Sequence, residues 1–149
     1  MEKNVFTVKL DIRIDWSEMD IFRHVNNVMF FKYMQAARVH YWEVIGLYKD
    51  FNETNTGPML VSASMQFRKP LFYPGNIIVQ TTIEFIKNTS FGLLHQILNA
   101  QNEIVAEGND VVVLYDFNTN EKVVIPQWLK DNITLVENEN TPDEKPVNE

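Results

Sequence analysis

The segment from Asn27 to about Ile45 is apolar on almost every face that a helix can present, and this feature limits the possible fold more than any other. Ala36 and Ala37 in its middle favour a helix, and Gly46 is a residue at which helices commonly end. Its polar side chains leave only a narrow hydrophilic edge, at positions 32, 35, 38 and 43. A helix that is hydrophobic nearly all round lies inside its protein. We therefore expect one long helix enclosed by a curved sheet.

The segments outside this helix predict about five strands. Residues 6–15 alternate strictly between apolar and polar side chains, which is typical of a half-buried strand. Four further segments have the pattern of strands: residues 61–67, 77–87, 90–100 and 104–116. The turns between the last three are short and polar, which indicates an antiparallel meander. Gly108 interrupts the last strand and predicts a bulge or a bend there that would help the strand curve around the helix.

These elements predict an α+β fold in which a curved antiparallel sheet of about five strands wraps around one long buried helix. The chain of 149 residues is long enough for one domain and too short for two of ordinary size. We assign this domain to residues 1–136, with a short helix from Gln127 to about Ile133. Residues 137–149 are acidic and rich in Asn, and we expect a disordered tail there.

The charge and the composition exclude several classes of function. The net charge is −7, and the tail contributes −4 of it through five acids and one lysine. The domain therefore has no positive field that would attract nucleic acid or anionic lipid. The absence of cysteine excludes disulfides, zinc–thiolate sites and a catalytic thiol. The His, Asp and Glu residues show no metal-ligand spacing, so we expect no metal.

No segment predicts export or membrane insertion. The first residues lack the basic and apolar regions of a secretory signal, and Lys32, Arg38 and Glu43 interrupt the most apolar segment. We expect a soluble, cytoplasmic protein. A single curved sheet of five strands has exposed edges, which commonly pair with another chain. A homodimer is the expected assembly, and a homotetramer is the alternative.

Two separated motifs resemble the hotdog thioesterases of the 4-hydroxybenzoyl-CoA thioesterase type. The first reads DWSEMD at 15–20, HVNNVMF at 24–30 and AAR at 36–38. The second, RKPLFYPGN at 68–76, is similar to the connection between the second and third strands of that family. Both motifs lie on matching elements over roughly residues 5–135. The resemblance implies the hotdog fold and hydrolysis of an acyl-CoA or acyl carrier protein thioester, with no cofactor apart from the coenzyme A of the substrate.

The resemblance implies that Asp20 is the catalytic carboxylate, because it occupies the acidic position in the loop before the buried helix. It also implies that the backbone N–H of Asn27 polarises the thioester carbonyl. First-turn N–H groups lack partners within their helix, and the helix dipole favours a developing oxyanion. Asp20 could attack the thioester directly or deprotonate a water molecule, and the sequence leaves both roles open. Without the resemblance, an Asp at this position would be interpreted as a turn or cap residue.

Two further residues of the first motif are candidate substrate contacts. His24 either contacts the substrate or positions the loop. A similar segment of plant acyl-ACP thioesterases carries a catalytic Asn where this chain has Phe22, which argues against a full plant-type site. Asn26 is a candidate contact and also suits a helix cap.

The remaining candidates lie later in the chain. Lys87, Thr89 and Ser90 fall at the turn where members of the family often contact the nucleotide end of coenzyme A. Ser64 is a candidate for a wall of the site that a partner subunit supplies. His95, inside an alternating strand, is expected to be a structural or interface residue.

Two other functions fit the same fold. One is a non-catalytic module that binds acyl thioesters, since a protein can keep a fold without keeping its catalytic activity. The other is a hydratase or dehydratase that would use His40 and Glu43 on the buried helix. The Pro-rich helix start of those enzymes is absent from this sequence, so this function ranks last.

Overall fold

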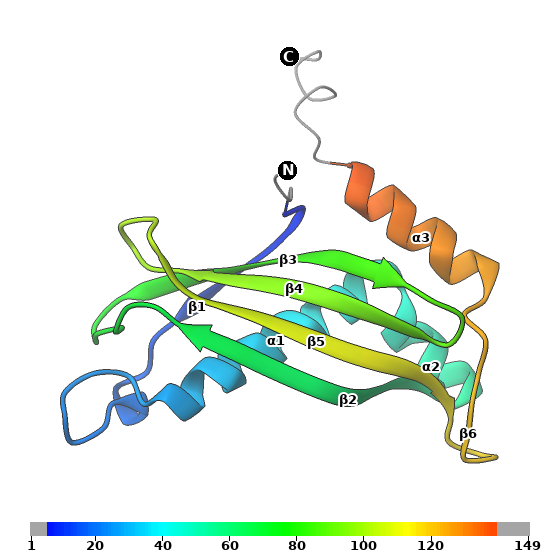
Figure 1. Ribbon diagram of the computed structural model, residues 1–149, viewed down its shortest axis with the longest axis horizontal. Coiled ribbons are helices and arrows are strands. Elements are labelled where there is room, and N and C mark those ends of the chain that lie inside the picture. Colours follow the sequence, from blue (N-terminus) through cyan, green and yellow to red (C-terminus); the bar gives the residue numbers. More distant parts are fainter. Residues whose placement is uncertain (1–5, 140–149) are drawn as a thin grey trace, which may run out of the picture.

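One antiparallel sheet forms most of the molecule (Figure 1). The computed structural model describes residues 6–139. The order of strands across the sheet is β1-β3-β4-β5-β2, and the short β6 pairs with β5. The strands are Val8–Arg13 (β1), Thr56–Phe67 (β2), Asn76–Ile86 (β3), Ser90–Leu98 (β4), Ile104–Asp116 (β5) and Glu121–Lys122 (β6).

The long helix α1, Asn27–Ile45, packs against one face of this sheet, which curls around it (Figure 1). Its bounds are those that the sequence predicts, because Asn26 caps its first turn and Gly46 ends it in the left-handed conformation, with φ 86°. The first half of α1 packs in a hydrophobic cluster that includes Tyr33, and the second half packs in another that includes Tyr41. A curved antiparallel sheet around a buried helix is the hotdog architecture, so the predicted fold is confirmed.

Gly108 allows α1 to approach β5 closely, and it does not form the predicted bulge. The pairing of β5 with β2 and β4 is regular at this residue. A Cβ atom at position 108 would lie 2.5 Å from the sulfur of Met34 and 3.0 Å from the carbonyl oxygen of Ser64. The missing side chain therefore makes room for the helix.

A buried ion pair joins α1 to the sheet. Arg38 donates to both carboxylate oxygens of Asp110, from Nε at 2.9 Å and from Nη2 at 3.1 Å. Asp110 also lies 2.7 Å from Nε2 of His95, and Thr81 lies 2.9 Å from the other ring nitrogen. Burial raises the pKa of Asp110, but the bonds from His95 and Arg38 outweigh this effect and hold the pKa below its usual value. His95 is 1% exposed and is thus a structural residue, as predicted.

The last helix, α3 (Gln127–Asn138), is longer than predicted. The sequence places Glu137 at the start of a disordered tail, but this residue lies in α3 and makes three hydrogen bonds. Its carboxylate accepts from the hydroxyls of Tyr41 and Thr82, each at 2.5 Å, and from the N–H of Ile83 at 3.1 Å. The pairing of β1 with β3 stops before this point. Glu137 therefore satisfies a backbone group of β3 that β1 does not reach.

Among the short elements that the sequence did not predict are α2, Leu47–Thr54, and β6. Neither is long enough to show a clear hydrophobic period. The strand β2 begins at Thr56, earlier than the predicted residue 61. Within residues 6–139 no helix is long and apolar enough to cross a membrane. The predicted tail from residue 140 onward lies outside the described residues.

Replacing Asp110 with Asn should lower the free energy of unfolding by about 3 kcal/mol, because Arg38 then keeps a largely buried charge without a counterion. Urea denaturation at neutral pH measures the loss, and Asp11→Asn on an exposed position of β1 is the matched control. The pKa of Asp110 is lower in the folded than in the unfolded chain, so this carboxylate stabilises the fold above about pH 4. The difference between wild type and variant should therefore shrink as the pH falls further. Equal stability of the two proteins at neutral pH would contradict the role of the pair.

Candidate active site

The residues between the first strand and α1 form a closed loop. It opens with a 3-10 turn, η1 (Trp16–Glu18), after which Met19 and Val25 pair as an isolated antiparallel bridge. The chain between these two residues thus returns on itself like a hairpin. Arg23 in this return has a φ of 74°, a left-handed conformation that residues other than Gly adopt infrequently. The loop is therefore a tight turn with a defined shape.

Asp20 lies at the start of this turn and is held by its own backbone. Its N–H donates to the carbonyl oxygen of His24 at 2.9 Å, and its carbonyl oxygen accepts from the N–H of Arg23 at 3.0 Å. The carboxylate oxygen Oδ1 accepts from the N–H of Phe22 at 2.9 Å, as is common for Asp in turns. The other carboxylate oxygen accepts no hydrogen bond from the described part of the chain. That oxygen is available to a ligand.

The N-terminus of α1 lies beside the Asp20 loop, in the same cleft. The side-chain oxygen of Asn26 accepts from the N–H of Val28 at 3.0 Å and caps the helix. A contact between Asn26 and a substrate stays a prediction. Asn27 is the first helical residue, where a backbone N–H has no intrahelical partner and the helix dipole adds positive charge. This N–H is therefore suited to an oxygen atom that gains negative charge.

The structure brings Asp20, His24 and Asn27 together in one cleft of 410 Å³. The remaining lining comes from the loop, from α1 and from the end of β2 with the segment after it: Val25, Phe30, Phe67, Arg68, Lys69 and Pro70. The rings of Phe30 and Phe67 meet edge to face, with centroids 5.4 Å apart. The cleft thus combines one carboxylate, one imidazole and a helix N-terminus with apolar walls. Such a mixture of a few polar groups and apolar side chains is typical of sites for small molecules.

Two cations on the cleft wall, Arg68 and Lys69, open the second motif, but the sequence did not predict them as site residues. Arg68 and Lys69 follow β2, and their side chains are 52% and 50% exposed. Arg68 pairs with Glu107 at 2.7 Å, and Lys69 pairs with Glu103 at 3.2 Å. The bond from Arg68 lowers the pKa of Glu107, and the bonds from Asn99 and Lys69 lower the pKa of Glu103. In the sequence, the feature that could have indicated this wall of the cleft is the pair of adjacent cations directly after a predicted strand.

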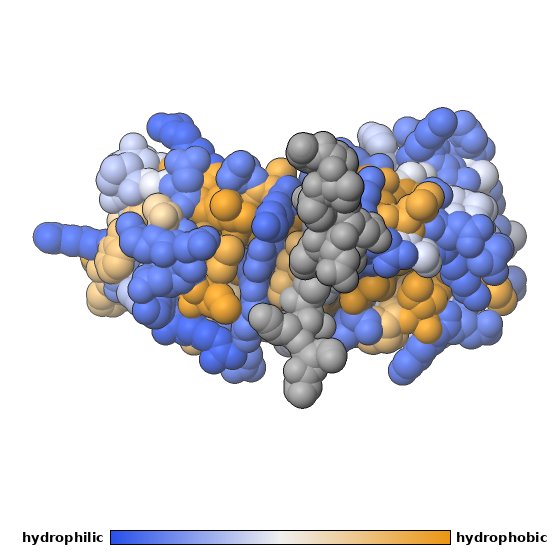
Figure 2. All heavy atoms as spheres, turned by 90° about the horizontal axis from the view of Figure 1, so that it is seen from above, coloured by the Kyte–Doolittle hydropathy of each residue, from blue (hydrophilic) through white to orange (hydrophobic). Residues whose placement is uncertain are grey.

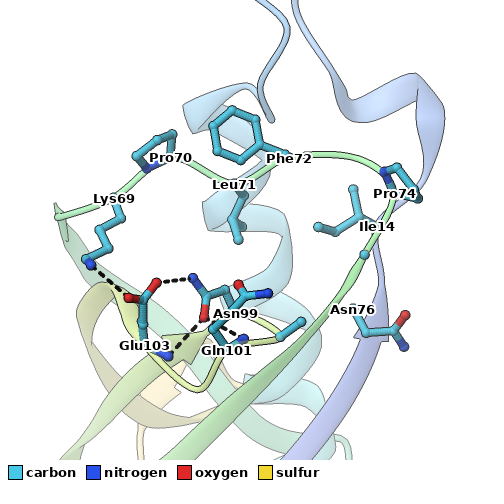
Figure 3. A pocket seen from close by; sticks show the side chains of 12 residues that line it. Ile14, Lys69, Pro70, Leu71, Phe72, Pro74, Asn76, Asn99, Gln101 and Glu103 are labelled. Atoms are coloured by element: carbon cyan, nitrogen blue, oxygen red, sulfur yellow. Dashed lines mark hydrogen bonds and ion pairs between the residues drawn. The ribbon is translucent and has the colours of Figure 1, made fainter.

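A second hollow, of 440 Å³, adjoins the cleft (Figure 3). It shares Lys69 and Pro70 with the cleft. Leu71 belongs to its apolar lining, and the Asn99 amide and the Lys69–Glu103 pair belong to its polar lining (Figure 3). A ligand longer than the cleft could extend past the shared residues toward these polar groups.

Four predicted substrate-binding residues are not among the lining of this cleft: Ser64, Lys87, Thr89 and Ser90. The last three lie at the turn between β3 and β4, at the end of the sheet away from the Asp20 loop (Figure 1). Ser64 lies in β2, and strand alternation turns its side chain away from the face on which Met65 packs against the core. The roles of these four residues stay predictions.

The residues that a hydratase or dehydratase would use do not line the cleft. On α1, Nδ1 of His40 lies 3.8 Å from a carboxylate oxygen of Glu43, and neither residue is part of the cleft lining. Among residues 6–139, no three His, Asp or Glu side chains gather in a way that could hold a metal ion.

Comparison with known proteins places these features in a family context. Residues 14–133 match the family model of the thioesterase-like superfamily. Long-chain acyl-CoA thioesterase FadM of Escherichia coli (strain K12) is 19% identical over 128 residues, which cover 85% of this chain and 96% of FadM. Protein THEM6 of Drosophila melanogaster is 32% identical over 63 residues, but these span 40% of this chain and only 33% of THEM6.

Solved structures show the same fold. The PA2801 protein of Pseudomonas aeruginosa matches with a TM-score of 0.78 and 24% sequence identity. The match covers 87% of this chain and 99% of PA2801.

Proposed function

The chain belongs to the thioesterase-like superfamily, and from this membership we propose that it hydrolyses an acyl-CoA thioester to a free acid and coenzyme A. The observation that carries the proposal is the cleft in which Asp20 lies together with the first residue of α1. A carboxylate and a helix N-terminus in one cleft suit acyl transfer, because the first can supply or activate a nucleophile and the second can stabilise an oxyanion.

In the proposed reaction, the backbone N–H of Asn27 donates to the thioester carbonyl oxygen. Asp20 either attacks the carbonyl carbon to form an anhydride or deprotonates a water molecule that attacks it. In both routes the C–S bond breaks and coenzyme A leaves as the thiolate, which takes up a proton. In the first route a water molecule then hydrolyses the anhydride, which releases the free acid and regenerates the Asp20 carboxylate; in the second the attacking water already supplies the acid's new oxygen. His24 would contact the substrate at the mouth of the cleft, where its ring meets Phe72 edge to face at 5.8 Å. No cofactor is required, because coenzyme A enters as part of the substrate.

A homodimer paired along β2 is part of this proposal. β2 is the last strand in the sheet order. Val61 on this strand is 55% exposed and Phe67 is 46% exposed, and Phe31 of α1 lies beside Phe67 with ring centroids 6.3 Å apart. An exposed apolar edge strand is a template for pairing with another chain. Seen from above, the surface of the single chain shows hydrophobic areas between hydrophilic ones (Figure 2).

The proposed pairing accounts for the predicted residues that lie far from the cleft. A twofold axis across β2 reverses one sheet relative to the other. The turn that carries Lys87, Thr89 and Ser90 in one subunit would then face the Asp20 end of the other. Ser64 would lie close to the boundary between the subunits. These residues would contact the substrate from the partner, with Lys87 directed at its phosphates.

Replacing Asp20 with Asn should reduce kcat for acyl-CoA hydrolysis by about 1,000-fold, because the amide can neither attack nor accept a proton. Steady-state assays on acyl-CoA substrates of increasing chain length, with an acyl carrier protein thioester as an added arm, measure the effect. Asp50→Asn on α2 is the matched control and should retain wild-type activity. Full activity of Asp20→Asn would remove Asp20 from the mechanism. Binding of acyl-CoA without turnover by the wild type would instead favour a non-catalytic binding module.

Replacing Val61 with Lys should convert the dimer to a monomer, because a charge at the pairing edge would be buried without a partner. Sedimentation velocity measures the change. Val124→Lys is the control, since Val124 is 58% exposed outside β2. A monomeric wild type, or a dimer that persists in Val61→Lys, would contradict the proposed pairing.

A further inference from the structure

Glu18 is a carboxylate at the base of the Asp20 loop, and the proposed chemistry does not use it. Its side chain is only 5% exposed. Buried charges in proteins are costly unless they are paired and hydrogen-bonded. The partners of Glu18 therefore indicate which segments this buried charge holds together.

The Glu18 carboxylate accepts three hydrogen bonds, from two parts of the chain. It accepts from the Tyr33 hydroxyl at 2.6 Å, from Nζ of Lys32 at 2.8 Å and from the backbone N–H of Asp15 at 2.9 Å. Burial raises the pKa of Glu18, but the bonds from Lys32 and Tyr33 outweigh this effect and keep the pKa below its usual value. The group is thus ionised at neutral pH. It connects the start of the loop to the second turn of α1.

The backbone of Glu18 connects the loop to the beginning of the same helix. Its carbonyl oxygen accepts from the N–H of Asn26 at 2.9 Å, and Asn26 is the residue that caps α1. The neighbouring Met19–Val25 bridge closes the loop at the same place. Through its side chain and its carbonyl group, Glu18 therefore holds both ends of the loop against α1.

The tip of the loop is held by hydrogen bonds within its own turn, and its apolar side chains are not buried. Ile21 is 85% exposed and Phe22 is 74% exposed. The position of Asp20 relative to the N–H of Asn27 is therefore set at the base of the loop. A displacement of a catalytic group by about 1 Å can cost about 100-fold in rate.

We propose that Glu18 is a positioning residue that holds Asp20 at the N-terminus of α1 in the geometry that the reaction requires. This inference rests on the proposed thioester hydrolysis. Glu18 contacts no substrate in this scheme and transfers no proton. Its loss should slow the chemical step and leave substrate binding nearly unchanged.

The test compares Glu18→Gln and Tyr33→Phe with the exposed control Glu53→Gln on α2, all in the full-length protein. Glu18→Gln can keep the acceptor oxygen that Tyr33 and the N–H of Asp15 share, but it places an amide donor against Nζ of Lys32 and removes the negative charge. It should lower kcat about 30-fold with KM changed less than about threefold. Tyr33→Phe removes one of the three bonds and should lower kcat about fivefold. Calorimetry should give the same Kd for coenzyme A in all variants. Circular dichroism and Tm establish that each variant is folded at the assay temperature.

The pH dependence of kcat/KM separates positioning from direct catalysis. If Glu18 positions Asp20, the variant profile keeps the wild-type midpoint and has a lower plateau. A lost or displaced midpoint would make Glu18 itself the titrating group and would overturn the inference. Wild-type kcat in both Glu18→Gln and Tyr33→Phe would overturn it as well, while the loss of activity in Asp20→Asn would leave the proposed function standing. A wild type that turns over no thioester would refute both proposals together.

Discussion

Arg38 and Asp110 carry opposite charges into the contact between α1 and β5, and the placement of the helix in the sheet depends on this contact. A buried ion pair is not in itself more stabilising than apolar packing, but removing one partner is costly. The two Arg38 bonds and the His95 contact of Asp110 require one arrangement of helix and strand. Gly108, two residues from Asp110, lets the helix come close enough to reach that arrangement. The rotation and the depth of α1 are thereby defined.

The same helix connects the core to the cleft. Because α1 is a rigid element, the packing of its middle and end also determines where its first residue lies. The loop before it is then tied to that end through Glu18 and through the Asn26 cap. Asp20 and the Asn27 N–H therefore belong to one framework, although within residues 6–139 the hydrogen bond that the Asp20 carboxylate accepts comes from its own turn. A site on a loop can have a well-defined geometry when the contacts that attach the loop to the rest of the protein are buried.

The sequence predicted the elements whose signals are local. The bounds of α1 agree because a cap residue and a glycine mark its ends. The five long strands lie where their alternating side chains predict them, although β2 begins five residues earlier, at Thr56. The role of Glu137 could not be predicted, since its partners Tyr41 and Thr82 are far away in the chain. The close approach of Gly108 to Met34 could not be predicted for the same reason, because it leaves no local pattern in the sequence. The motif around Asp20 identified three cleft residues, whereas the opposite wall with Arg68 depends on how β2 ends beside α1.

Burial explains why similar ion pairs have different consequences in this molecule. Arg38 and Asp110 are 12% and 0% exposed, so neither can exchange its partner for water without a large cost. Lys69 and Glu103 on the cleft wall are 50% and 48% exposed, and a pair of this kind contributes about 1 kcal/mol or less. A phosphate or carboxylate of a ligand can therefore replace Glu103 on Lys69 with little loss of fold stability. The Arg38–Asp110 pair therefore holds α1 on the sheet. The Lys69–Glu103 pair keeps Lys69 beside the cleft, where this cation can exchange Glu103 for another anion.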